Sequence, residues 1–161
     1  MGWNDARINL IAPGFAAVTE GEVVLDDEGY VCSPAIVRYV RKQATPNECI
    51  SISSLNNFLR PRGFVIGDCR ERTTTLERGA VQVYCAYDTP EDVGFIQVQF
   101  TLNRSSNLRL DEWSKFIESL SQRWPLQIEG RANNSMDASE IAQVLTSTHA
   151  WRDFASAYGW K

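Results

Sequence analysis

Residues 95–102 limit the fold more than any other part of the chain. From residue 96 to residue 102 every even-numbered side chain is apolar and every odd-numbered one is Gln or Thr. Successive side chains of a strand point to opposite faces, so this strand has one buried face and one face in water. Such one-sided burial is typical of antiparallel sheets, because parallel sheets are normally covered on both faces. The pattern therefore predicts an antiparallel sheet with one face left to solvent.

A helix with one apolar stripe follows and can cover the other face of that sheet. Residues 111–123 place their apolar side chains at helical spacing, and Pro125 disfavours helical geometry at Trp124, which ends the helix. The stripe consists of Trp113, Phe116, Ile117, Leu120 and Trp124. A second strand over residues 80–87 precedes the first, and a turn-rich loop over residues 88–94 joins them. These elements predict a helix packed on an antiparallel strand pair.

Shorter patterns predict the remaining elements. They are a hairpin of residues 22–25 and 30–32 turning at Gly29, a helix over 33–43 capped by Ser33-Pro34, a helix over 54–59, strands over 64–69 and 126–130, a helix capped by Asp137, and a helix around 151–158. Strands gather in the middle of the chain and helices at its end, without βαβ alternation. We therefore predict an α+β fold, with an antiparallel-dominated sheet packed against helices in a single two-layer domain over residues 1–161.

No motif for catalysis or metal binding is present. The cysteines at positions 32, 49, 69 and 85 include no closely spaced pair, and His149 is the one histidine. Arg70 and Arg72 could activate a thiolate at Cys69, but Asp68 and Glu71 oppose that effect. We predict no catalytic residue, no metal and no cofactor, and four reduced thiols, with Cys32 and Cys85 packed as small hydrophobes. A small enzyme with an unrecognised site stays open.

Targeting patterns are missing as well. The first residues lack a basic segment followed by a long apolar core, which a secretory signal would need. No apolar run approaches the roughly 20 residues that span a bilayer. The expectation is a cytoplasmic protein that has no membrane partner.

The charges are unevenly distributed. The net charge is −4, made up of −5 over residues 1–30, +4 over residues 31–78 and −3 over the remainder. Binding to a phosphate backbone depends mainly on Lys and Arg, so the acidic balance argues against a nucleic-acid partner. The basic middle segment keeps nucleic-acid binding open as a minor alternative.

Acidic side chains and terminal tryptophans are the candidate binding residues. Two predicted hairpin tips carry six carboxylates: Asp26, Asp27, Glu28, Asp88, Glu91 and Asp92. Carboxylates at tips add nothing to a core, although exposed loops are commonly polar without any function. Trp3 and Trp160 lie next to the termini, where a large aromatic side chain is hard to bury. Exposed aromatic residues near acidic loops are typical of protein-binding surfaces.

A small, acidic, tryptophan-bearing α+β chain with acidic tips resembles the bacterial immunity proteins that neutralise polymorphic or contact-dependent toxins. The resemblance is one of overall character, and no family residue is transferred by it. It implies a cytoplasmic inhibitor that covers the active site of a basic toxin domain, with carboxylates that mimic substrate phosphates or pair with basic residues. An adaptor, a chaperone or a phage-type accessory protein is the alternative among non-catalytic functions.

Overall fold

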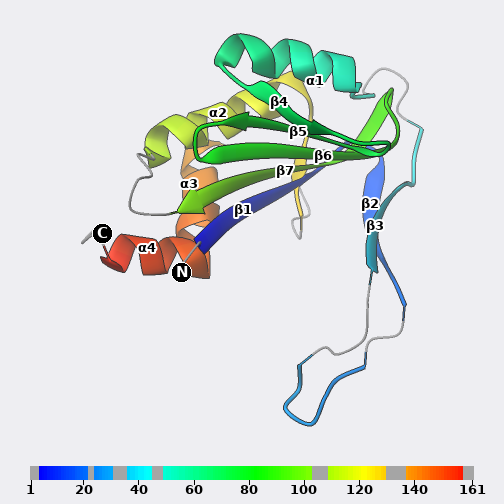
Figure 1. Ribbon diagram of the computed structural model, residues 1–161. Coiled ribbons are helices and arrows are strands. Elements are labelled where there is room, and N and C mark those ends of the chain that lie inside the picture. The colour runs from blue at the N-terminus through cyan, green and yellow to red at the C-terminus, as the bar shows by residue number, and fades with distance from the viewer. Residues whose placement is uncertain are drawn as a thin grey trace.

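A computed structural model describes residues 4–21, 24–30, 36–44, 49–102, 109–129 and 137–157. Within these ranges the chain forms a large and a small antiparallel sheet together with four α-helices (Figure 1). The strands are β1 (Asn4–Ile11), β2 (Phe15–Glu20), β3 (Ile36–Arg41), β4 (Val65–Cys69), β5 (Thr73–Arg78), β6 (Val81–Thr89), β7 (Asp92–Leu102) and β8 (Gln127–Ile128). The helices are α1 (Ile52–Leu59), α2 (Leu110–Arg123), α3 (Ala138–Ser147) and α4 (His149–Ala157), and the 3-10 turn η1 (Arg60–Arg62) follows α1. The predicted antiparallel α+β fold is confirmed.

The main sheet has the strand order β4-β5-β6-β7-β1-β8, with antiparallel neighbours throughout. Strand β7 lies inside it and pairs with β1 over eight residues, from Asn4 opposite Leu102 to Ile11 opposite Phe95. The predicted alternation is confirmed. Ile96 and Val98 are fully buried, whereas Gln97 on the opposite face is half-buried and donates a hydrogen bond of 2.7 Å to Asn9 on β1.

The core lies between this sheet and the helices. Helices α2 and α3 lie on one side of the sheet (Figure 1), and one continuous cluster of buried side chains joins helices and strands. Asp137 caps α3 as predicted, because its side chain accepts a hydrogen bond from the Glu140 N–H. Helix α1 begins at Ile52, two residues earlier than predicted, because Ser51 caps it by accepting a hydrogen bond from the Ser54 N–H. Helix α2 ends before Trp124, as Pro125 requires.

The predicted helix over residues 33–43 is wrong, because residues 36–41 form strand β3. Val37, Tyr39 and Val40 are β-branched or aromatic residues, which pack well on a pleated surface. Strand β3 pairs with β2 along its whole length, and the Tyr39 ring stacks on Phe95 of the main sheet at 4.2 Å. The pairing with β2 and this stacking contact outweigh the short helical pattern of residues 33–43. Ser33 and Pro34, which suggested the helix start, lie outside the described residues.

The predicted loop over residues 88–94 is shorter than expected. Strand β6 continues to Thr89 and β7 begins at Asp92, so that Pro90 and Glu91 make the turn. Gly94 is an unpaired extra residue between the pairs Tyr87–Val93 and Ala86–Phe95, which is a β-bulge. A side chain at Gly94 would meet the Phe15 ring at 2.6 Å, so only glycine allows β2 to approach this closely.

Candidate functional site

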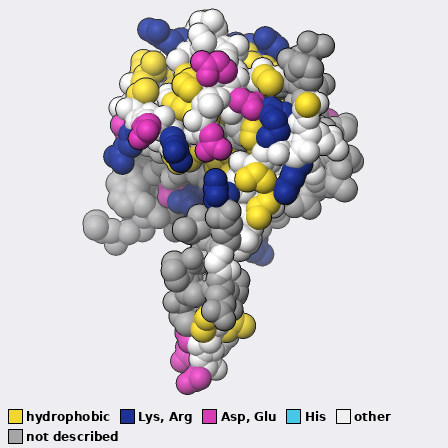
Figure 2. All heavy atoms as spheres, turned by 90° about the vertical axis from the view of Figure 1, so that its right-hand side faces the viewer, with side chains coloured by type: hydrophobic (Ala, Val, Ile, Leu, Met, Phe, Trp, Pro, Cys, Tyr) yellow, Lys and Arg dark blue, Asp and Glu magenta, His cyan; other side chains and the backbone are white. Residues whose placement is uncertain are grey.

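An arm projects from the body of the molecule. We use this name for strands β2 and β3 together with residues 24–30, which lie at the end farthest from the main sheet (Figure 1). The two strands pair from Phe15 opposite Arg41, next to the main sheet, to Glu20 opposite Ile36 farther out. The same projection is visible from a perpendicular direction in Figure 2.

The turn at the end of the arm is held by hydrogen bonds among its own residues. The Asp26 N–H donates to the Tyr30 carbonyl at 2.8 Å, and the Gly29 N–H donates to the Asp26 carbonyl at 3.0 Å. Oδ1 of Asp26 accepts from the backbone N–H groups of Glu28 and Tyr30, both at 2.9 Å. Gly29 has a φ of 89°, which glycine adopts without steric cost. The predicted acidic turn is confirmed, while residues 22–23 and 31–32 of the predicted hairpin lie outside the described residues.

Three large apolar side chains stand beside the acidic ones on this turn. Val24 is 44% exposed, Leu25 57% and Tyr30 68%, and Asp26, Asp27 and Glu28 are exposed as well. Figure 2 shows hydrophobic and acidic side chains together at the free end of the arm. Among the described residues only Val65 and Ile66, on edge strand β4, are other large hydrophobic residues with comparable exposure.

The sequence pattern did not single out these apolar side chains as binding residues. Val24, Leu25 and Tyr30 belong to hairpin strands that are too short to show which face is buried. The signal that could have found them is their position directly beside an acidic turn in the chain.

The second predicted acidic tip lies on the body, away from the end of the arm (Figure 1). Asp88 and Glu91 are exposed there, whereas the Asp92 carboxylate forms an ion pair with Arg41. The six predicted carboxylates therefore do not form one surface. Trp3 and Trp160, the other predicted binding residues, lie outside the described residues.

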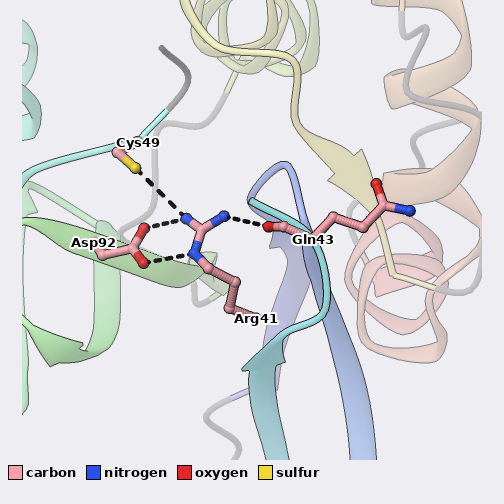
Figure 3. Close-up of polar contacts among 4 residues, drawn as sticks. All are labelled: Arg41, Gln43, Cys49 and Asp92. Atoms are coloured by element: carbon pink, nitrogen blue, oxygen red, sulfur yellow. Dashed lines mark hydrogen bonds and ion pairs between the residues drawn. The ribbon is translucent and has the colours of Figure 1, made fainter. Parts of the chain in front are cut away.

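Arg41 and Asp92 form a clamp at the root of the arm (Figure 3). Arg41 Nε donates to Asp92 Oδ2 at 2.8 Å, and Nη2 donates to Oδ1 of the same carboxylate. Nη1 donates to the Gln43 carbonyl at 2.8 Å, and the guanidinium lies 4.6 Å from the centre of the Phe15 ring. The hydrogen bond to Asp92 raises the pKa of Arg41 above its ordinary value, so the guanidinium stays charged. We call this pair the Arg41–Asp92 clamp.

A tyrosine–glutamate contact joins the arm to the β8 edge of the main sheet. Tyr39 on β3 directs its hydroxyl to both carboxylate oxygens of Glu129 at 3.3 Å, directly after β8. Burial, together with the charge of Glu129 and this hydrogen bond, raises the pKa of Tyr39 to about 12. The hydroxyl therefore stays protonated at neutral pH and can donate to Glu129.

A pocket of about 340 Å³ opens where the arm meets the uncovered face of the main sheet. Its lining comes from β2, β3, β5, β6 and β7 and from the turn before β5. Aromatic rings of Phe15, Tyr39, Tyr84 and Phe95 make up much of the wall, and the guanidinium groups of Arg38 and Arg72 and the carboxylate of Asp88 add charge to it. No sequence motif indicated this pocket, because its residues come from separate strands.

The residues weighed for catalysis or metal binding do not come together in the described parts of the chain. Cys69 is exposed and lies 3.7 Å from the Thr74 hydroxyl, while Arg70 beside it pairs with Asp68 at 3.0 Å. His149 begins α4. Within the described ranges, no group of three or more His, Cys, Asp or Glu residues could hold a metal ion, and no helix is long and apolar enough to cross a membrane.

The cysteines differ in burial, and we expect them to differ in reactivity. Cys49 and Cys69 are exposed, whereas Cys85 on β6 is buried and desolvation raises its pKa to about 12. In native protein at pH 8, without reductant, a thiol reagent should modify Cys49 and Cys69 rapidly and Cys85 only on unfolding. In denaturant four thiols should react, Cys32 among them, and a count of two or none would indicate disulfides.

The same burial predicts a dependence of stability on pH. The unfolded chain releases the Cys85 proton near the ordinary thiol pKa of 9.0, whereas the folded chain keeps it up to about 12. The stability linked to this group is therefore complete below pH 9 and is lost as the pH rises toward 12. Urea unfolding of wild type and Cys85→Ala between pH 8 and pH 10 should show a steeper loss for wild type.

Comparisons of the chain with protein-family models, with curated proteins and with solved structures give no match.

Proposed function

We propose that this chain is a protein-binding module that docks onto its partner through residues 24–30 of the arm. The observation that carries the proposal is an ordered turn, far from the core, that exposes Val24, Leu25 and Tyr30. Complete burial of a fully exposed apolar side chain contributes about 1.5–3 kcal/mol, and a partner that covers these three partly exposed side chains gains a share of that from each. Tyrosine is also among the residues that most often dominate the binding energy of interfaces.

The charges of the turn favour a basic partner. Asp27 and Glu28 are exposed on the same turn. We place them at the rim of the contact, because a carboxylate keeps its water there. Carboxylates at a rim contribute mainly to the rate of association and to the choice of partner, because water and salt screen their attraction. The apolar residues then supply most of the affinity.

The size of the arm suggests how it binds. A stable flat interface usually takes 20–30 residues from each side, many more than the seven residues from 24 to 30. A projecting arm compensates when it enters a cleft, because several of its sides are then covered at once. An acidic arm in the basic active-site cleft of an enzyme would block that site. We therefore propose a bacterial immunity protein that acts in the cytoplasm and inhibits a basic toxin domain.

Capture of the partner from the native cell, followed by co-expression, tests this function. Wild-type protein should retain one basic protein that kills the host when expressed alone and is harmless when this chain is co-expressed. The double variant Leu25→Ser, Tyr30→Ser should lose at least 100-fold in affinity for it and should no longer protect. A captured partner that is not toxic would instead assign the adaptor function.

A matched control separates the arm from apolar exposure in general. Val65→Ser, Ile66→Ser removes two side chains of 63% and 46% exposure from edge strand β4, and we expect unchanged affinity and protection. Equal losses for both double variants would contradict docking through the arm. Replacing Asp27 and Glu28 with Asn and Gln should slow association and reduce its dependence on salt, while the dissociation rate changes little.

A further inference from the structure

Strand β2 of the arm has an open edge without the usual protection. In the parts of the chain that the structure describes, β2 pairs with β3 on one side and with no strand on the other. Open edge strands normally carry a charge, a proline or a β-bulge, which hinders pairing with another chain. Residues 15–19 are Phe-Ala-Ala-Val-Thr, with no charge and no proline, and their register with β3 is regular.

The other edge strands of the described structure have such protection. The ladder of β4 has a bulge between Ile66 and Asp68, and Asp68 adds a charge. Strand β3 carries Arg38 and Arg41, and β8 has two residues. Strand β2 is therefore the edge that most readily accepts a further strand.

The backbone groups that β2 offers at this edge follow from its pairing with β3. The Lys42 N–H donates to the Gly14 carbonyl at 2.6 Å, so the facing residues Phe15 and Arg41 are a non-hydrogen-bonded pair. Such pairs alternate with hydrogen-bonded pairs along an antiparallel ladder. Every second residue from Phe15 therefore directs its N–H and its carbonyl away from β3. These residues are Phe15, Ala17 and Thr19.

The outward groups are symmetric about Ala17, which suits the same strand running in the opposite direction. Ala17 then faces Ala17 of the second copy, and each N–H donates to the opposite carbonyl. The Thr19 N–H donates to the Phe15 carbonyl of the second copy. The Phe15 N–H is not needed, since it already donates to the Ala12 carbonyl at 3.2 Å. Among the described residues, the other groups in this scheme have no partner.

The side chains also suit a second copy. Ala17 and Thr19 are exposed, and the strand has no charge from Phe15 to Thr19 that would repel its own copy. We propose that two copies of this chain pair through β2, antiparallel about Ala17, and form one sheet in the order β3-β2-β2-β3. This pairing does not depend on the proposed docking of the arm.

The direction of the strands extends the contact beyond β2. Because β2 runs outward from the root of the arm, antiparallel pairing brings the end of each arm toward the root of the other copy. The six residues of β2 alone are fewer than the 20–30 that each side of a stable interface usually supplies. Parts of β3 and of residues 24–30 then add to the contact. A partner that docks onto residues 24–30 would therefore compete with the second copy.

Replacement of Ala17 by either charge tests the register, because this residue faces itself in the dimer. Sedimentation of wild type from about 1 μM to about 1 mM should show a reversible dimer. Ala17→Lys and Ala17→Glu each place two like charges directly opposite, which destabilises a strand pair. Each variant alone should dimerise at least about five-fold more weakly than the equimolar mixture, in which Lys faces Glu. The exposed position of Ala17 leaves the folded monomer intact.

Amide exchange tests the backbone pairing itself. The N–H groups of Ala17 and Thr19 should exchange more slowly as the protein concentration rises, because the second copy bonds them. The N–H groups of Ala16 and Val18 point toward β3 and should be protected at every concentration. Hydrogen exchange followed by NMR resolves these four amides.

Three results would overturn the proposal. The first is a chain that stays monomeric up to about 1 mM. The second is a mixture of the two Ala17 variants that dimerises no better than either alone, and the third is exchange at Ala17 that does not depend on concentration. Val65→Lys on edge strand β4 is the matched control and should leave the dimer unchanged. Loss of the dimer in this control would place the contact at β4 instead.

Discussion

Trp113→Ala is expected to lower the free energy of unfolding by about 3–5 kcal/mol. The side chain is 7% exposed and lies in the layer between α2 and the sheet. Its ring meets Phe64 at 6.4 Å, Phe100 at 6.0 Å and Phe116 at 5.6 Å, so its removal leaves a cavity that three other rings line. Urea unfolding followed by circular dichroism measures the loss.

Two variants on the same helix serve as controls for Trp113. Lys115 is exposed, and Lys115→Ala should change stability by less than about 0.5 kcal/mol. Phe116 is only half-buried, although it stacks on Phe64 at 5.3 Å, so Phe116→Ala should cost less than Trp113→Ala. A loss below about 1 kcal/mol for Trp113→Ala would mean that α2 does not pack on the sheet through this side chain.

Asp92→Asn should cost about 1–3 kcal/mol of stability, because it breaks the Arg41–Asp92 clamp. The Arg41 and Asp92 side chains are 27% and 28% exposed, so the pair is partly buried. Breaking an exposed ion pair costs about 0–1 kcal/mol of stability and breaking a buried one costs about 3–5 kcal/mol, and we expect a cost between these for the clamp. Arg41→Gln should cost a similar amount. The double variant should cost less than the two single losses added together, because both single variants remove the same interaction.

An exposed ion pair provides the comparison for the clamp. Arg70 and Asp68 form a pair at 3.0 Å, with side chains 77% and 55% exposed, and Asp68→Asn should cost less than about 1 kcal/mol. If Asp68→Asn and Asp92→Asn have the same effect in urea unfolding, the clamp does not stabilise the root of the arm.

Local sequence patterns predicted the elements whose burial repeats along the chain. The alternation at residues 96–102 and the stripe from Trp113 to Trp124 each extend over many residues, so a single buried face decides them. Side-chain caps at Asp137 and the stop at Pro125 are also local, and the structure has both. The acidic turn at residues 26–29 was predictable for the same reason, because Asp26 and Gly29 build it from neighbouring groups.

Contacts between distant residues account for what sequence patterns could not predict. Strand β3 depends on its pairing with β2 and on the stacking of Tyr39 on Phe95, which is 56 residues away in the chain. Strand β5 consists of Thr and charged residues around a single Leu76, so its pattern gave no clear signal. The clamp and the pocket likewise form only when the arm crosses the sheet. Their residues have no common spacing in the sequence.

Strands β2 and β3 of the arm are attached to the main sheet at one end only of their length, the end at Phe15 and Arg41. At that end Phe15 packs against Gly94, and the Ala12 N–H donates to the Gly94 carbonyl at 3.0 Å. Arg41 donates hydrogen bonds to the Asp92 carboxylate there. The turn at residues 24–30 is held separately, by hydrogen bonds among its own residues. A variant at Phe15 or Arg41 therefore acts on the root of the arm and leaves the hydrogen bonds of the turn in place.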